Sequence, residues 1–331
     1  MITFFACPKP FHGHIDIIQR NAIKSWTLLK PKPEIVLLGI EEGSAEVCSE
    51  LGLVHIPGVD RNEYGTPLIK SIFQIGQERA SHPTVCYLNS DIILMSDFMR
   101  TVEIVVARMT RFLILGQRWD VDIKEAWEFA AEDWETDLKV LVARKGTLHP
   151  PTGIDFFCFP RGLHSDIPPF AVGRPGWDNW MVWRTRSNGV PIVDVTNAVT
   201  AIHQNHKPVK GVMRELGAKE VGSGNHAYVS SNIVRYDGRW VELGPEAQRN
   251  VAMVPDDKKS LNIWAATWMV DKRGRLGRRP LTLKPSYLYY QLKFVVPLYW
   301  PAFGRAVRWI LKIRDALLRG TKSKIRKAKV V

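Results

Sequence analysis

A carboxylate interrupts an apolar run near residue 90. Residues 87–94 read YLNSDIIL, which is strand-like apart from its polar centre, and Asp91 stands in that centre. An unpaired charge inside a sheet is costly, so Asp91 requires a partner. A neighbouring Arg or a helix N-terminus would serve. So would Mg²⁺ or Mn²⁺ bridging two phosphates, because these hard cations prefer carboxylate oxygen.

Two other polar groups stand at the ends of predicted elements. Residues 173–183 read GRPGWDNWMVW, in which a glycine-rich turn leads into a helix whose first turn carries Asp178. An acid in that place can simply stabilise the helix N-terminus. Residues 201–206 read AIHQNH, and His203 and His206 follow the apolar start of this segment. Taken alone, the two histidines could belong to a surface loop.

Strand-like and helix-like segments alternate through the first 205 residues. Apolar runs predict strands at 2–7, 34–40, 53–57, 84–95 and 112–116, with helices at 15–29, 43–52, 67–80 and 96–109. Nearly continuous hydrophobicity in alternating strands predicts an α/β fold with a mostly parallel sheet covered by helices on both faces. Reactive groups are then expected beyond the carboxyl ends of the strands. The Gly-rich and polar residues 206–260 predict long loops.

Residues 1–206 resemble the GT-A-fold nucleotide-sugar glycosyltransferases, which are related to Rossmann folds, in the order and spacing of these motifs. The DxD motif of that superfamily falls on Asn89-Ser90-Asp91, so only the last acid matches. The resemblance implies that Asp91 binds a divalent cation, Mn²⁺ or Mg²⁺, beside the donor diphosphate, and that Asn89 hydrogen-bonds a ribose hydroxyl. It also implies a metal-binding His after the last core strand, with His203 as the first choice and His206 as the alternative.

The same resemblance implies a catalytic role for Asp178. GT-A enzymes have a Gly-containing loop followed by an xED-type motif, whose final acid deprotonates the acceptor hydroxyl in inverting members. Trp177-Asp178 matches that motif by position, with Trp in place of the acidic middle residue. Asp178 is then the general base, and Trp177 and Trp180 are acceptor-facing rings, with one tryptophan of this helix left for the core.

Four other residues are predicted to bind the nucleotide sugar. Pro8 ends the first strand, where such folds meet the nucleotide base. Arg61, in the polar loop 60–66, either meets a phosphate or belongs to an ordinary surface loop. Asp120 follows the strand at 112–116 and either contacts the donor sugar or caps the next helix. Asp155 could hold hydroxyls of the sugar or the acceptor.

Basic charge is concentrated at the C-terminal end. Residues 272–331 hold 17 Lys or Arg and one acid, whereas residues 1–271 hold 29 basic and 32 acidic residues. We therefore predict a catalytic domain over 1–270 and a basic extension over 271–331, and no nucleic-acid partner for the mildly acidic body. Aromatic residues at 287–300 and a basic amphipathic segment at 303–318 favour an anchor on an anionic membrane through residues 287–331. The alternative is a helix packed on the catalytic domain.

Together these features predict a glycosyltransferase that moves a sugar from a nucleotide-diphosphate sugar to a hydroxyl of a glycan or lipid-linked acceptor, in polysaccharide or glycolipid biosynthesis. We expect a cytoplasmic protein, peripheral at the inner face of the cell membrane, because the N-terminus has no signal-peptide pattern and the four cysteines lack CxxC spacing. Two alternatives stay open. One is a sugar-nucleotide nucleotidyltransferase, although the Gly-rich loop ending in Lys that this class carries after its first strand is missing. The other is a non-catalytic glycan- or lipid-binding module that has lost metal binding, which the incomplete motif at 89–91 allows.

Overall fold

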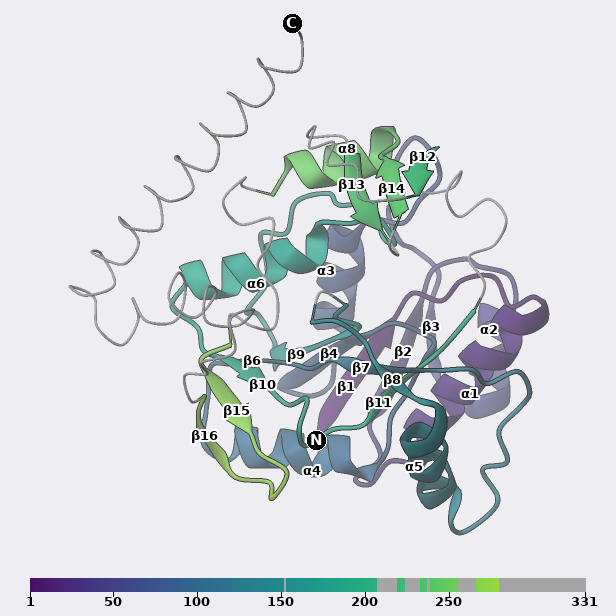
Figure 1. Cartoon of the computed structure of the whole chain (residues 1–331), viewed down its shortest axis with the longest axis vertical. Helices are drawn as coiled ribbons and strands as arrows, with labels where there is room; N and C mark the ends of the chain where they lie inside the picture. The colour runs from purple at the N-terminus through teal and green to yellow at the C-terminus, as the bar shows by residue number, and fades with distance from the viewer. Residues whose placement is uncertain (152, 207–218, 224–232, 237–238, 255–265, 280–331) are drawn as a thin grey trace, which may run out of the picture.

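A nine-stranded sheet forms the centre of the molecule (Figure 1). The computed structural model describes residues 1–151, 153–206, 219–223, 233–236, 239–254 and 266–279. The spatial order of the strands is β16-β15-β10-β6-β9-β4-β1-β2-β3. In that order they span Leu276–Arg278, Trp268–Val270, Ile192–Asp194, Leu113–Leu115, Phe156–Pro160, Thr84–Leu88, Ile2–Ala6, Glu34–Leu38 and Val54–Ile56.

The large sheet is mostly parallel. β1 pairs in parallel with β2 and β4, β2 with β3, and β10 with β6 and β15. β9 lies antiparallel between β4 and β6, and β16 is an antiparallel edge strand. The predicted α/β fold with a mostly parallel sheet is therefore confirmed. The carboxyl ends of its parallel strands meet at one edge, which is where ligands bind in open α/β sheets.

Helices cover both faces of this sheet. Neighbouring residues of a strand point to opposite faces, and β1 shows the result. Phe4 packs edge-on against Trp26 of α1 (Gly13–Leu28) and Phe98 of α4 (Ser96–Val106), on the face that α2 (Ser44–Leu51) also covers. Phe5 packs edge-on against Phe73 of α3 (Ile69–Arg79), on the face shared with α6 (Trp177–Ser187).

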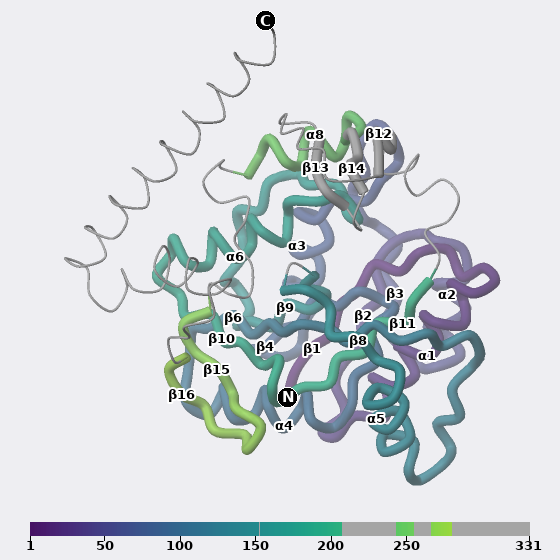
Figure 2. The backbone as a smooth tube through the Cα atoms, viewed as in Figure 1, coloured from purple at the N-terminus to yellow at the C-terminus, as the bar shows by residue number. Residues whose placement is uncertain are grey.

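A second, four-stranded sheet has the order β5-β11-β7-β8. Its strands span Ile92–Ile93, Ala201–Gln204, Arg118–Val121 and Thr147–Leu148. One face buries Ile93, Val121 and Ile202 against α5 (Trp134–Lys145), which lies alongside in Figure 2. Alternation along the strands therefore turns Asp120 and His203 to the opposite face.

Three features differ from the sequence prediction or extend it. The strand predicted at 84–95 is broken, because β4 ends at Leu88 and β5 begins at Ile92. Residues 206–260, predicted as long loops, include the antiparallel strands β12 (Lys219–Ser223), β14 (Arg239–Glu242) and β13 (Ile233–Tyr236) and the helix α8 (Pro245–Ala252). The large sheet also continues past residue 270 into β16.

The predicted membrane anchor at 287–331 lies outside the described residues. Among the residues that the structure describes, no helix combines the length and the apolar character needed to cross a bilayer.

Candidate active site

A break in the sheet brings Asp91 to the carboxyl edge. After β4 the chain turns, and the Ile92 N–H donates to the Asn89 carbonyl at 3.2 Å. The Asn89 N–H donates to the Asp155 carbonyl at 2.9 Å, immediately before β9. Asp91 is only 8% exposed in this turn. The expensive buried carboxylate that the sequence indicated is therefore real.

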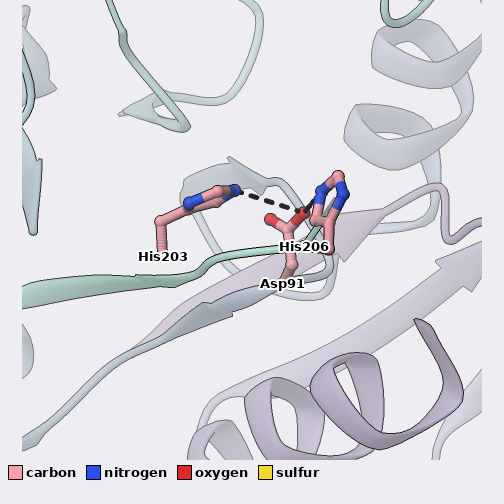
Figure 3. Close-up of side chains that lie close together, drawn as sticks. All are labelled: Asp91, His203 and His206. Carbon is pink, nitrogen blue, oxygen red and sulfur yellow. Dashed lines mark ion pairs between the residues drawn. The ribbon is translucent and has the colours of Figure 1, made fainter. Parts of the chain in front are cut away.

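Asp91 faces two histidines (Figure 3). The Nε2 atom of His203, on β11, lies 3.8 Å from Asp91 Oδ2, and the Nε2 atom of His206 lies 3.5 Å from the same oxygen. One ligand atom from each of the three side chains can be chosen so that all lie within 4.8 Å of one another. The structure thus brings together the first-choice and the alternative histidine.

The three side chains fit a divalent cation. Asp91 Oδ1 is buried and accepts no hydrogen bond from the described residues. Buried polar atoms are nearly always satisfied, so an orphaned carboxylate oxygen indicates an absent partner. One carboxylate and two imidazoles form a mixed oxygen and nitrogen donor set, which a divalent cation of intermediate hardness accepts.

Nearby positive charge keeps Asp91 ionised. Burial alone would raise its pKa, but the hydrogen bond with His206 and the charges of His203 and Lys9 lower the pKa below its usual value. Lys9 follows β1, and its Nζ lies 3.4 Å from His206 Nε2. A ligand carboxylate must be ionised to bind a cation, and Asp91 meets that requirement at neutral pH.

Asp120 lies beside His203, on the side of the ring opposite Asp91. The parallel register of β11 and β7 sets His203 directly beside Asp120, with Nδ1 3.2 Å from Oδ1. His149 Nδ1 lies 2.6 Å from the other oxygen, and Arg118 Nε donates to Oδ1 at 2.9 Å. Burial opposes ionisation of Asp120, but its interactions with His203 and His149 lower its pKa. His203 Nδ1 makes no hydrogen bond of good geometry to the described residues, so Asp120 acts on this ring through its nearby negative charge.

Asp155 is held by two partners beside the same turn. Arg118 Nη1 donates to its Oδ2 at 2.5 Å, and the Asn89 side-chain amide donates to its Oδ1 at 2.6 Å. The Tyr87 hydroxyl donates to Asn89 Oδ1 at 3.1 Å. The Asn89 amide, predicted to bind a ribose, is therefore engaged inside the protein in this structure.

Asp178 is a carboxylate with a raised pKa. It lies in the first turn of α6, after Gly176 with φ of 111°, and its Oδ1 accepts the Asn179 N–H at 2.8 Å. Burial, with a further contribution from the charge of Asp155, raises the pKa of Asp178 to about 6, against the lowering effect of its backbone hydrogen bonds. At neutral pH Asp178 is mostly ionised and is still basic enough to take a proton.

The predicted acceptor-facing tryptophans are core residues, so that prediction is corrected. Trp177 is 7% exposed and Trp180 is 4% exposed. Trp177 packs edge-on against Tyr87 with ring centroids 5.4 Å apart, and Trp180 packs against Phe170 at 5.8 Å. Their rings are used in packing α6 on the sheet and leave little surface for a sugar.

The fold is similar at low level to several solved structures. One is the mannosyltransferase PcManGT from Pyrobaculum calidifontis with GDP-Man and Mn²⁺, at 12% identity and a TM-score of 0.41; the match covers 64% of this chain and 59% of that chain. Another is glucosyl-3-phosphoglycerate synthase from Mycobacterium tuberculosis with Mg²⁺ and UDP, at 13% identity and a TM-score of 0.38; the match covers 66% of this chain and 74% of that chain. A third is TarS 1–349 from S. aureus (10% identity, TM-score 0.30), of which the match covers 38%, along with 38% of this chain. No family model matches the chain, and no curated protein matches it. At these TM-scores the similarity carries no argument about function, which has to be drawn from the side chains.

Two predicted donor-binding residues lie at the ends of β1 and β3. Pro8 is buried directly after β1. Arg61 is bound to protein groups: its Nη2 donates to Glu41 Oε1 at 2.6 Å and its Nη1 to the Gly65 carbonyl at 2.8 Å. The other oxygen of Glu41 is buried and accepts no hydrogen bond from the described residues. Glu41 was not predicted, and its position just after β2 was the signal available.

Three further residues of the site were also missed. Arg118 stands two residues before Asp120 on one strand, a spacing that puts both side chains on one face and could have identified it. Lys9 directly follows Pro8, in the segment after the first strand. His149 follows the short strand β8, which the sequence pattern did not indicate.

Proposed function

We propose that this chain is a divalent-metal-assisted glycosyltransferase that uses a nucleotide-diphosphate sugar as donor. The observation that carries the proposal is the cluster of Asp91, His203 and His206 at the carboxyl edge, with one Asp91 oxygen left unpaired among the described residues. Asp178, a second carboxylate with a raised pKa, feels the charge of Asp155, which is bonded to the turn that holds Asp91.

Asp91, His203 and His206 are the residues that would hold the cation. Bound there, it would neutralise charge that develops on the leaving diphosphate. Lys9 lies beside His206 and is exposed, so its ammonium can add a second positive charge on the donor side. The negative charge of Asp120, 3.2 Å from His203 Nδ1, would make this imidazole a stronger ligand for the cation.

Asp178 takes the proton of the acceptor hydroxyl. The acceptor oxygen forms a bond to the anomeric carbon of the sugar while the bond from that carbon to the diphosphate oxygen breaks, and the nucleoside diphosphate leaves with the electron pair. A carboxylate with a pKa of about 6 suits this step, because general bases work best when their pKa lies near the working pH.

The acceptor and the location are proposed from the sequence. We propose a glycan or lipid-linked acceptor in polysaccharide or glycolipid biosynthesis, and a cytoplasmic enzyme attached at the inner face of the membrane through residues 287–331. The support for this attachment is the strongly basic composition of residues 272–331.

The proposal is tested by nucleotide binding. Thermal shift and calorimetry with UDP, dTDP, GDP, CDP and ADP, each with and without Mn²⁺, should give selective stabilisation by one nucleotide, and mainly with the cation. When the free ligand concentration is a hundred times the dissociation constant, binding adds about 2.7 kcal/mol to the free energy of unfolding.

The Asp91→Asn substitution should abolish the part of nucleotide binding that depends on Mn²⁺. Asp97→Asn is the matched control. Asp97, in the first turn of α4, is equally buried and also has one oxygen without a partner among the described residues, but it accepts the Thr200 N–H and lies outside the cluster of Asp91, His203 and His206. Absence of any cation-dependent nucleotide binding would leave a non-catalytic module, and incorporation of nucleoside monophosphate into a sugar phosphate would identify a nucleotidyltransferase.

A further inference from the structure

The helix α8 contacts the segment that leads into Asp178, although its residues lie some 70 positions further along the chain. We propose that α8 is a positioning element for the general base, in which Asn250 and Glu246 hold the loop 171–176 and so fix the start of α6. This inference rests on the proposed catalytic role of Asp178.

Asn250 binds the backbone of the loop. Its Oδ1 accepts the Ala171 N–H at 2.9 Å, and its Nδ2 donates to the Ala171 carbonyl at 3.0 Å and to the Arg174 carbonyl at 3.4 Å. Asn250 is 1% exposed, so water does not replace these bonds. An amide that pairs with both the N–H and the carbonyl of one residue acts as a strand neighbour would, and it holds the backbone in one position.

Glu246 ties the same loop to a second one. Its Oε2 accepts from Arg174 Nη2 at 2.9 Å and Nε at 3.3 Å, and its Oε1 accepts from Asn62 Nδ2 at 2.6 Å. The two loops also share backbone bonds, from Ile69 N–H to the Phe170 carbonyl at 2.8 Å and from Val172 N–H to the Pro67 carbonyl at 3.0 Å. Glu246 is 8% exposed and therefore joins, inside the protein, the loop next to Arg61 and the loop before Asp178.

Gly176 brings α8 within two residues of Asp178. A side chain at Gly176 would put its Cβ 3.3 Å from Val254 Cγ2 and 3.4 Å from the Asn250 carbonyl oxygen. Its φ of 111° is also strained for any other residue. The end of α8 thus packs directly on the turn from which α6 begins.

The consequence for catalysis follows from distance. A misplacement of about 1 Å between reacting groups can cost on the order of a hundredfold in rate. The proposed metal ligands belong to β11, the residues after it and the turn after β4, so loosening α8 should move Asp178 and leave the cation site in place. The expected signature is a lower kcat with unchanged donor binding.

The test uses the full-length chain with Glu246→Ala, Glu246→Gln and Asn250→Asp. Glu246→Ala removes both links and Asn250→Asp turns a donor into an acceptor facing the Ala171 carbonyl, so kcat should fall about tenfold or more while the calorimetric affinity for nucleotide with Mn²⁺ stays within about twofold. Glu246→Gln keeps an oxygen for Asn62 or Arg174 and should restore most of the turnover lost in Glu246→Ala.

Arg249→Gln is the matched control on the same helix, because its ion pair with Glu63 is half-exposed. Hydrogen exchange supplies a readout that does not depend on activity: amides 170–180 should exchange faster in Glu246→Ala and Asn250→Asp, and not in Arg249→Gln. Full turnover in Glu246→Ala, or a parallel loss of donor affinity, would overturn the positioning role.

Asp178→Asn separates this inference from the proposed function. An inactive Asp178→Asn with a fully active Glu246→Ala refutes the positioning role alone. An active Asp178→Asn refutes the general base, and the positioning role with it.

Discussion

Replacing Asp178 by Asn should make the protein more stable and less active. The pKa of Asp178 is raised from an ordinary 3.8 to about 6, chiefly by burial. One pKa unit is about 1.4 kcal/mol, so the folded state holds the ionised carboxylate at a cost of about 3 kcal/mol. The amide that replaces it would not ionise, and the amide oxygen can still accept the Asn179 N–H that Asp178 accepts now.

The sign of the pH dependence follows from the raised pKa. The protonated carboxyl favours the folded state, so its contribution is fully present below pH 3.8 and is lost as the pH rises through 6. The variant should therefore exceed the wild type by up to about 3 kcal/mol at pH 8, and the gain should shrink to a fraction of a kcal/mol near pH 4. Denaturant unfolding at both pH values measures this difference.

Activity should move in the opposite direction. Wild-type kcat should rise about tenfold from pH 5 to pH 7 as Asp178 ionises. The Asp178→Asn variant should have a kcat that is lower by about 10²-fold to 10⁴-fold and does not rise over this pH range. Nucleotide affinity should stay the same, because the base contacts the acceptor. Asn caps a helix almost as well as Asp. A variant that is no more stable at pH 8 and turns over within a few-fold of wild type would show that Asp178 is only a cap.

Three further predictions concern the cation site and the tail. Asp91→Asn should abolish Mn²⁺-dependent nucleotide binding in calorimetry with little change in melting temperature, and unchanged affinity would remove Asp91 from the site. His203→Ala and His206→Ala should each weaken Mn²⁺ affinity, and a silent His206→Ala would leave His203 as the ligand. Asp120→Asn should weaken Mn²⁺ affinity by about tenfold, because it removes the negative charge beside His203 Nδ1. Removing residues 301–331 lowers the net charge from +13 to +4, so the truncated protein should stay folded but stop sedimenting with anionic vesicles, whereas a lower melting temperature would favour a packed helix.

The fold could be predicted because its strands are buried on both faces. Continuous apolar runs such as residues 34–38 and 84–88 identified the parallel strands, and helical spacing identified α1 and α4. The antiparallel insertion of β9 could not be seen, because pairing direction leaves no mark on a strand whose two faces are both apolar. The polar centre at residues 89–91 was visible, but one continuous strand was predicted over 84–95 because apolar residues flank that centre on both sides.

Site residues were predicted correctly only where a residue of that type, at that place in the sequence, has few other roles. The buried Asp at a strand end indicated Asp91, and the resemblance to GT-A enzymes added His203 and His206; the structure brings the three together. Trp177 and Trp180 were misassigned because a tryptophan in a helix serves equally well in the core and at a surface. Glu41 and His149 depend on tertiary contacts across loops, for which the sequence has no periodic signal.

The asparagine in place of the first acid of the DxD pattern has a local cause. The Asn89 amide donates to Asp155 Oδ1 at 2.6 Å, and Asp155 is itself paired with Arg118. An aspartate at this position would set two carboxylates at that distance, and such a pair cannot stay doubly ionised without taking up a proton or a cation. Asn89 avoids this repulsion and leaves Asp91 as the carboxylate that faces the two histidines. The bond to Asp155 thus gives Asn89 a structural role that an aspartate could not fill without a proton or a cation between the two carboxylates.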